Sequence, residues 1–183
     1  MPDHFSSQRM PQLPAASARL VLWERTRPWS RFFLNQVRQT PSLDRINPVM
    51  LADRAICVAT LDELRETIDR HPASFVFAEV SVANFRELPG QIPRLRSTKP
   101  RLSIAVVCFE LPEQPIDEYH ILDSLFHEAG ATAVLAAQRD LLAMIPAVLT
   151  HFAALEQPET HWRDLIEQRL PWRNVGQNKP FSR

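Results

Sequence analysis

Three glutamates are the side chains of this sequence best placed to do chemistry. Glu24, Glu79 and Glu110 each lie directly after or just past a run of apolar residues. If those runs are strands of one parallel sheet, their carboxyl ends meet at the edge where ligands collect. Clustered carboxylates at such an edge could hold Mg²⁺. Isolated glutamates after strands are also common, however, and no histidine or lysine is placed to act with these three.

The composition excludes other catalytic motifs. The three glycines, at positions 90, 130 and 176, allow neither a Gly-rich phosphate loop nor a Gly-x-Ser-x-Gly turn. Two cysteines and scattered histidines give no zinc-ligand spacing. The histidines fall mostly in the N-terminal arm and at helix ends or surfaces, where a solvated imidazole is expected. The sequence therefore predicts no cofactor.

Charge is balanced overall but unevenly distributed. The 21 basic and 21 acidic side chains produce no strong positive field, which argues against a general nucleic-acid binder. Both ends are basic, whereas 102–160 is acidic and has Arg139 as its only basic residue. This asymmetry favours a partner with a basic face or contact of tail with body, and equally a solvated acidic surface. DNA association through the arginine-rich ends is a weaker alternative.

A membrane-bound or exported protein is not expected. No apolar run approaches the roughly 20 residues that span a bilayer. The first residues also lack the order of charged and apolar groups that a signal peptide has. The sequence predicts a cytoplasmic protein.

Five apolar runs predict buried strands, at 20–23, 55–59, 75–78, 102–108 and 133–136. Helical patterns follow each run, and Thr60 with Glu63 forms a capping box at the start of one helix. Pro89 and Pro93 should shorten or kink the third helix, and Pro146 should bend the last one. The stretch 40–53 has no clear period and is expected to be an inserted loop.

Alternating strands and helices predict an α/β fold with a doubly wound five-stranded parallel sheet in the order 2-1-3-4-5, the flavodoxin-like arrangement. The predicted organisation is a flexible arm over 1–17, one domain over 18–156, an extra helix over 157–172 and a disordered tail over 173–183. The extra helix is amphipathic, with large apolar residues at helical spacing, and it either packs on its own domain or docks on another protein. Its apolar residues are Trp162, Leu165, Ile166, Leu170 and Trp172.

The span from Arg19 to about Leu155 resembles the receiver domain of bacterial response regulators. The resemblance lies in the first, third and fourth strands and in the turn Glu128-Ala129-Gly130-Ala131 before the fifth. It implies a receiver-like fold. In that family, an acidic pair and a phosphoacceptor aspartate bind Mg²⁺, and a hydroxyl and a lysine assist phosphoryl transfer.

The positions that carry receiver activity are degenerate in this sequence. Glu24 keeps at most one acid of the acidic pair, and Glu79 replaces the phosphoacceptor aspartate. Cys108 replaces the hydroxyl residue, Val134 the aromatic switch, and Ala137 the lysine. The resemblance therefore implies a pseudo-receiver without the groups that stabilise charge on a transferred phosphoryl group.

We expect a non-catalytic module that binds another protein or itself, in signalling or within an assembly, independently of phosphorylation. The alternative is a small metal-dependent enzyme or ligand binder that uses Glu24, Glu79 and Glu110. Glu79 could mimic a phosphorylated state or be a solvated loop acid. In either case, replacing Glu79 with alanine is expected to leave the fold intact.

Overall fold

The computed structural model describes residues 18–25, 29–42, 46–81, 83–108 and 116–156. Five parallel strands form one sheet in the order β2-β1-β3-β4-β5, which confirms the predicted fold class. The strands are β1 (Leu20–Trp23), β2 (Ile56–Val58), β3 (Phe75–Glu79), β4 (Ser103–Val107) and β5 (Ala133–Leu135).

The central strands are buried on both faces because helices cover both sides of the sheet. Every residue of β1 and β3 is buried, and Leu22 of β1 pairs with Phe77 of β3. The edge strands β2 and β5 have three residues each and are partly exposed. Short edge strands limit pairing with other chains. Both β2 and β5 are also shorter than the apolar runs that predicted them.

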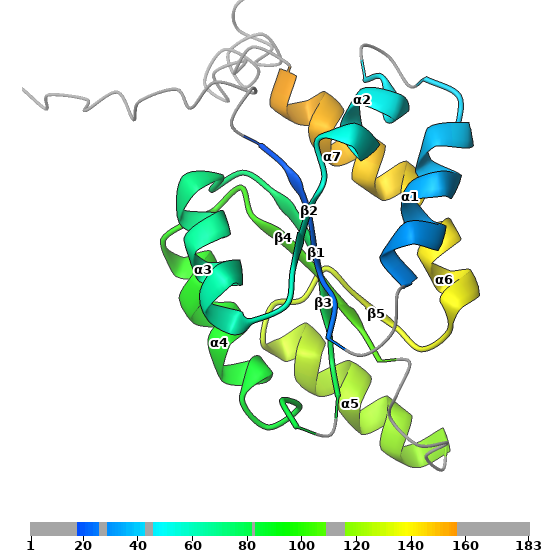
Figure 1. Ribbon diagram of the computed structural model, residues 1–183. Coiled ribbons are helices and arrows are strands. Elements are labelled where there is room, and N and C mark those ends of the chain that lie inside the picture. The colour runs from blue at the N-terminus through cyan, green and yellow to red at the C-terminus, as the bar shows by residue number, and fades with distance from the viewer. Residues whose placement is uncertain (1–17, 26–28, 43–45, 82, 109–115, 157–183) are drawn as a thin grey trace, which may run out of the picture.

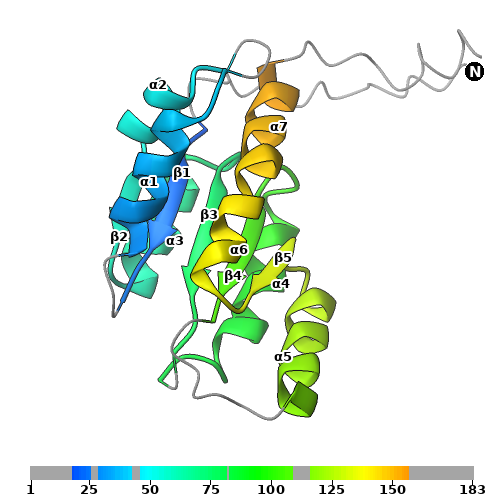
Figure 2. The same cartoon turned by 90° about the vertical axis from the view of Figure 1, so that its right-hand side faces the viewer.

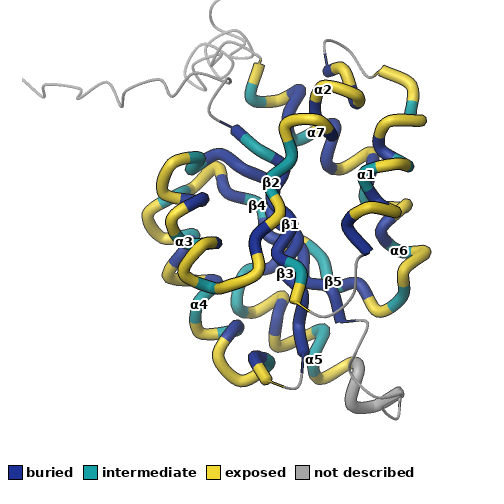
Figure 3. The backbone as a smooth tube through the Cα atoms, viewed as in Figure 1, coloured by how far each residue is buried: buried dark blue, intermediate teal, exposed yellow. Residues whose placement is uncertain are grey.

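Helices form a layer on each face of the sheet (Figures 1 and 2). On one face lie α1 (Trp29–Gln39), α2 (Pro48–Asp53), α6 (Gln138–Ala143) and α7 (Ile145–Glu156). On the other lie α3 (Leu61–Arg70), α4 (Leu88–Ser97) and α5 (Ile116–Glu128). Alternate strand residues point into the two layers, so the sheet is the most buried part of the chain (Figure 3).

An aromatic cluster fills the layer that contains α1. Phe77 lies at its centre and is fully buried. Its ring centroid lies 4.9 Å from that of Phe33, 5.2 Å from Phe75 and 6.3 Å from Trp29. The cluster fixes the start of α1 against the carboxyl-terminal half of β3, the region that holds the predicted site.

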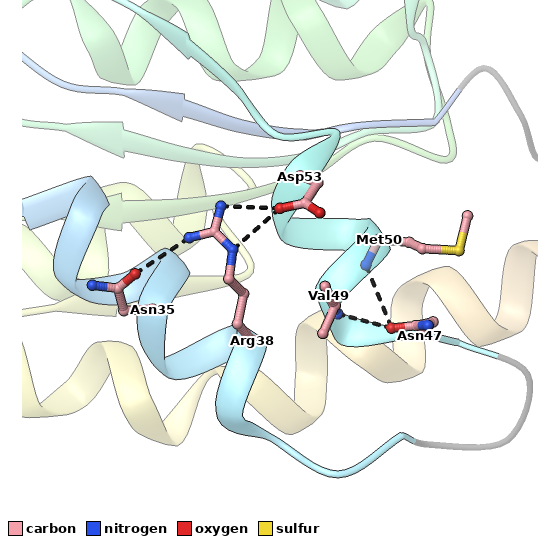
Figure 4. A network of polar contacts seen from close by, with 6 residues as sticks. All are labelled: Asn35, Arg38, Asn47, Val49, Met50 and Asp53. Atoms are coloured by element: carbon pink, nitrogen blue, oxygen red, sulfur yellow. Dashed lines mark hydrogen bonds and ion pairs between the residues drawn. The ribbon is translucent and has the colours of Figure 1, made fainter.

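The prediction of a loop over 40–53 was wrong, because the second half of this stretch forms α2. Asn47 caps the helix, with its side-chain oxygen accepting from the Val49 N–H at 3.0 Å, and Pro48 occupies the first turn. Arg38 of α1 donates to Asp53 at 3.1 and 3.2 Å, which ties the two helices together (Figure 4). Six residues are too few to show a helical period, so only the Asn-Pro start signalled α2.

The other helix boundaries follow local signals in the sequence. The Thr60 side chain accepts from the Glu63 N–H at 3.2 Å and completes the predicted capping box. Pro89 lies in the first turn of α4, and Pro93 lies inside that helix. The predicted single last helix is divided at Met144 into α6 and α7. The predicted arm 1–17, helix 157–172 and tail 173–183 lie outside the described residues.

Candidate functional site

The four predicted receiver-site positions lie along the carboxyl edge of the sheet. Glu24 comes directly after β1, Glu79 ends β3, Cys108 comes directly after β4, and Ala137 precedes α6. The Cys108 N–H donates to the Leu135 carbonyl at 2.8 Å, which extends the ladder between β4 and β5 to this edge. Glu110 lies outside the described residues.

The carboxylate of Glu79 is buried and held by the start of the α1 layer. Glu79 is 1% exposed. One of its oxygens, Oε2, accepts from the backbone N–H of Arg25 at 2.7 Å and from the indole N–H of Trp29 at 3.2 Å. Interpreting Glu79 as a solvated loop acid was therefore wrong. Through these hydrogen bonds, the carboxylate links the segment between β1 and α1 to the end of β3.

Glu24 anchors the start of α1. Its two carboxylate oxygens accept from the backbone N–H of Ser30 at 3.2 Å and from the Ser30 hydroxyl at 2.5 Å. The first N–H groups of a helix have no partner within the helix, and negative charge is favourable there. Glu79 thus binds Arg25 after β1 and Trp29 at the start of α1, and Glu24 binds Ser30 in the first turn of α1.

The described carboxylates do not form a metal site. Nowhere in the described part of the chain do three His, Cys, Asp or Glu side chains come together as a metal ion would require. Glu24 and Glu79 each bind protein donors instead. The described residues therefore do not fit the Mg²⁺ of a working receiver. The alternative metal-dependent site also uses Glu110, which lies outside the described residues.

Cys108 and Ala137 offer neither a hydroxyl nor a cation. Burial, and secondarily the charge of Asp123, raises the pKa of the Cys108 thiol to about 12, so the thiol stays protonated at neutral pH. Ala137 lies just before the first residue of α6, and its N–H donates to Asp140 Oδ2 at 2.8 Å. Neither position provides the charge stabilisation that phosphoryl transfer needs.

Sequence reasoning missed two residues that shape this edge. Asn84 is buried, donates through Nδ2 to the Glu79 carbonyl at 3.0 Å and accepts from the Ser81 N–H at 2.8 Å. Trp29 belongs to the helical pattern that follows the first apolar run. A buried indole N–H usually has a partner, but nothing in the sequence identifies that partner as Glu79.

A small crevice lies beside this edge, between β1 and the starts of α3 and α4. Its volume is about 230 Å³, and Trp23, Arg25, Thr60 and Gln91 are among the residues that line it. Pockets for drug-sized ligands usually measure about 300–1,000 Å³. The crevice is therefore smaller than a typical pocket for a drug-sized ligand.

Similarity to known proteins is found among solved structures. No protein-family model matches the sequence, and no curated protein matches it significantly. Among solved structures, the chain is similar to a CheY-like protein, TadZ, from Pseudomonas aeruginosa PAO1, with 17% sequence identity and a TM-score of 0.47. The match covers 71% of this chain and 92% of the other.

The chain has a receiver-like fold. This assignment rests on its own strand order and on the helices that cover both faces of the sheet. At the edge where the active groups of a receiver would lie, the two described carboxylates hold the α1 connection.

One histidine of the receiver-like domain departs from the predicted solvated state. The Nε2 atom of His151 lies 2.9 Å from the Ala73 carbonyl and Nδ1 lies 3.1 Å from the Ser103 hydroxyl. Since a carbonyl only accepts, Nε2 carries the proton and Nδ1 accepts from Ser103. The ring also packs edge-on against Phe75 and Phe152. His151 therefore joins α7 to the amino-terminal ends of β3 and β4.

The burial of His151 predicts an acid-sensitive fold. Burial lowers the pKa of His151, although its hydrogen bond to Ala73 opposes the shift. Below the ordinary histidine pKa of about 6.5, the unfolded chain takes up a proton that the folded protein resists. The contribution of His151 to the free energy of unfolding should be complete above this pH. It should fall as the pH drops from there towards the lower pKa that His151 has in the folded state.

Urea unfolding between about pH 7.5 and about pH 5 measures this effect. The loss of stability on acidification should be smaller in His151→Gln than in the parent protein. His127→Gln is the matched control because His127 is exposed and its ion pair within the described residues is with Asp123 on its own helix. An unchanged pH dependence in His151→Gln would contradict the prediction.

Proposed function

We propose that the protein is a non-catalytic pseudo-receiver that acts as a protein–protein interaction module. It serves signalling or an assembly, and it does so independently of phosphorylation. The partner is another protein or a second copy of the chain, and nucleic acid is not the main ligand. A cytoplasmic location is part of the same proposal. No helix in the described ranges is long and apolar enough to cross a membrane.

The state of Glu79 carries the proposal. A phosphoacceptor must present its carboxylate to an incoming donor and to a metal ion. The Glu79 carboxylate is instead buried and accepts from Arg25 and Trp29. The neighbouring strand ends provide a protonated thiol at Cys108 and a methyl group at Ala137. These features support a fold whose role is to present binding surfaces and not to transfer a phosphoryl group.

Exposed apolar groups also support an interaction role. Ile121 and Leu125 lie one helical turn apart on α5 and are 66% and 41% exposed. They belong to the acidic segment 102–160, which suits a partner with a basic face. We assign the main contact to the stripe of large apolar residues in 157–172. The stripe comprises Trp162, Leu165, Ile166, Leu170 and Trp172.

Treatment with a small acyl phosphate and Mg²⁺ tests the independence from phosphorylation. Intact-mass measurement should show no adduct on the parent protein or on Glu79→Asp, because Ala137 and Cys108 stay in place in both. Mg²⁺ should also leave the melting curve unchanged. A functional receiver domain treated in parallel controls for the donor. One phosphoryl group on Glu79 would overturn the proposal.

The interaction role is tested by removing the two tryptophans of the stripe. The double variant Trp162→Ala/Trp172→Ala should lose the partner or the self-association, since tryptophan anchors in interfaces contribute about 2 kcal/mol or more each. Capture from the native cell and analytical ultracentrifugation measure the two cases. Leu142→Ala removes an exposed apolar side chain from α6 and serves as the control. Unchanged binding in the double variant would show that the interface does not include the two tryptophans.

A further inference from the structure

A groove lies at the amino-terminal edge of the sheet, opposite the degenerate receiver site. It has a volume of about 260 Å³ and lies between the start of β1, α2 and the end of α7. Its apolar lining includes Leu20, Ile46, Leu51 and Phe152, all of them buried. The exposed side chain of Met50 also lines it. The polar residues Arg19, Asn47, Arg54 and Glu156 also belong to the lining. The space is below the range of drug-sized ligands and has room for one large side chain.

The groove lies where the described chain ends. Ala18 and Glu156, the first and last described residues, both line it, and β1 begins and α7 ends at the same end of the molecule (Figures 1 and 2). From Glu156, the six residues to Trp162 can reach up to about 20 Å when extended. The carboxyl-terminal segment therefore starts at the edge of the groove, with its first tryptophan within reach.

We propose that segment 157–172 docks on its own domain in this groove, with Trp162 as the apolar group that enters it. The stripe of large apolar residues defined above distinguishes this segment from the arm 1–17, whose large apolar groups are few and do not recur at helical spacing over several turns. Such a stripe needs an apolar cover in the free protein. The inference rests on the proposed function and deepens it, because the docked state covers the residues that a partner would bind.

Hydrogen–deuterium exchange on the free full-length chain tests the docking. The amides of 162–170 should be protected in the parent protein. Met50→Glu, which places a charge at the groove, should accelerate their exchange by at least about tenfold. Val49→Glu is the matched control: Val49 is 45% exposed and Met50 48%, but Val49 does not line the groove and extends from α2 in another direction (Figure 4). Trp162→Ala should give the same acceleration as Met50→Glu and leaves the groove itself unaltered.

Each other outcome overturns the proposal. An unprotected segment in the parent protein, or protection that Met50→Glu and Trp162→Ala leave unchanged, means that the segment does not use the groove. Protection that rises with protein concentration means that a second copy covers the stripe. A response to Met50→Glu confined to 1–17 means that the amino-terminal arm occupies the groove. The measurement needs no partner, so its failure is distinguishable from failure of the interaction role.

Discussion

Replacing Glu79 with alanine should lower the free energy of unfolding by about 2–4 kcal/mol. The change leaves the indole N–H of Trp29 and the backbone N–H of Arg25 without their acceptor. A donor left unsatisfied on burial costs about 1–3 kcal/mol, which applies in full to the buried indole and only in part to the N–H of Arg25, an exposed residue. Denaturant unfolding followed by circular dichroism measures the loss. This result would correct the sequence-based expectation that the substitution leaves the fold intact.

Two further variants show whether the carboxylate acts through these hydrogen bonds. Glu79→Gln keeps one side-chain oxygen that can accept, so it should recover most of the lost stability. Glu24→Ala removes the acceptor for Ser30 at a less buried position and should cost only about 1 kcal/mol, as for a typical helix cap. Equal stability of Glu79→Ala and the parent protein would show that the buried carboxylate contributes nothing to the fold.

Replacing Phe77 with alanine should have a still larger effect, a loss of about 3–5 kcal/mol. The fully buried Phe77 ring contacts the rings of Phe33, Phe75 and Trp29, so its removal leaves a cavity at the centre of one layer. Domains have about 5–15 kcal/mol of total stability. The variant should therefore lose a large part of its stability in denaturant unfolding.

Phe32→Ala is the control for the loss of an aromatic ring. Phe32 lies on α1 and is 36% exposed, whereas its neighbour Phe33 is fully buried. The Phe32 variant should lose less than about 1 kcal/mol, as most surface substitutions do. Similar losses in the Phe77 and Phe32 variants would contradict the central position of the Phe77 ring in the core.

The fold was predictable because its signals are strong and repeated. Unbroken apolar runs such as Leu20–Trp23 predict strands covered on both faces, and the helical pattern after each run requires crossover connections. Right-handed crossovers then leave few possible strand orders. Thr60 and Glu63 marked a helix start through hydrogen bonds within one turn. In contrast, α2 was missed because its six residues show no period.

The candidate site was predictable only in its position at the carboxyl edge. Glu79 could be assigned to the end of a strand, but its burial depends on Trp29 and Arg25, which reach it from another segment of the chain. His151 shows the same limit, because its partners Ala73 and Ser103 are distant in sequence. A single sequence gives the type and spacing of residues, whereas long-range hydrogen bonds depend on how the layers pack.

The central position of β1 also has a consequence for synthesis of the protein on the ribosome. Leu20 pairs with Phe75 and Trp23 pairs with Ala78, so β1 cannot complete its pairing until β3 has emerged. Until then, an apolar strand lacks one of its two neighbours, and such unpaired strands promote aggregation. Pairings between distant segments also slow folding. Nascent chains that end before Glu79 should therefore depend on chaperones, and β4 should then add to the free side of β3 and β5 to the free side of β4.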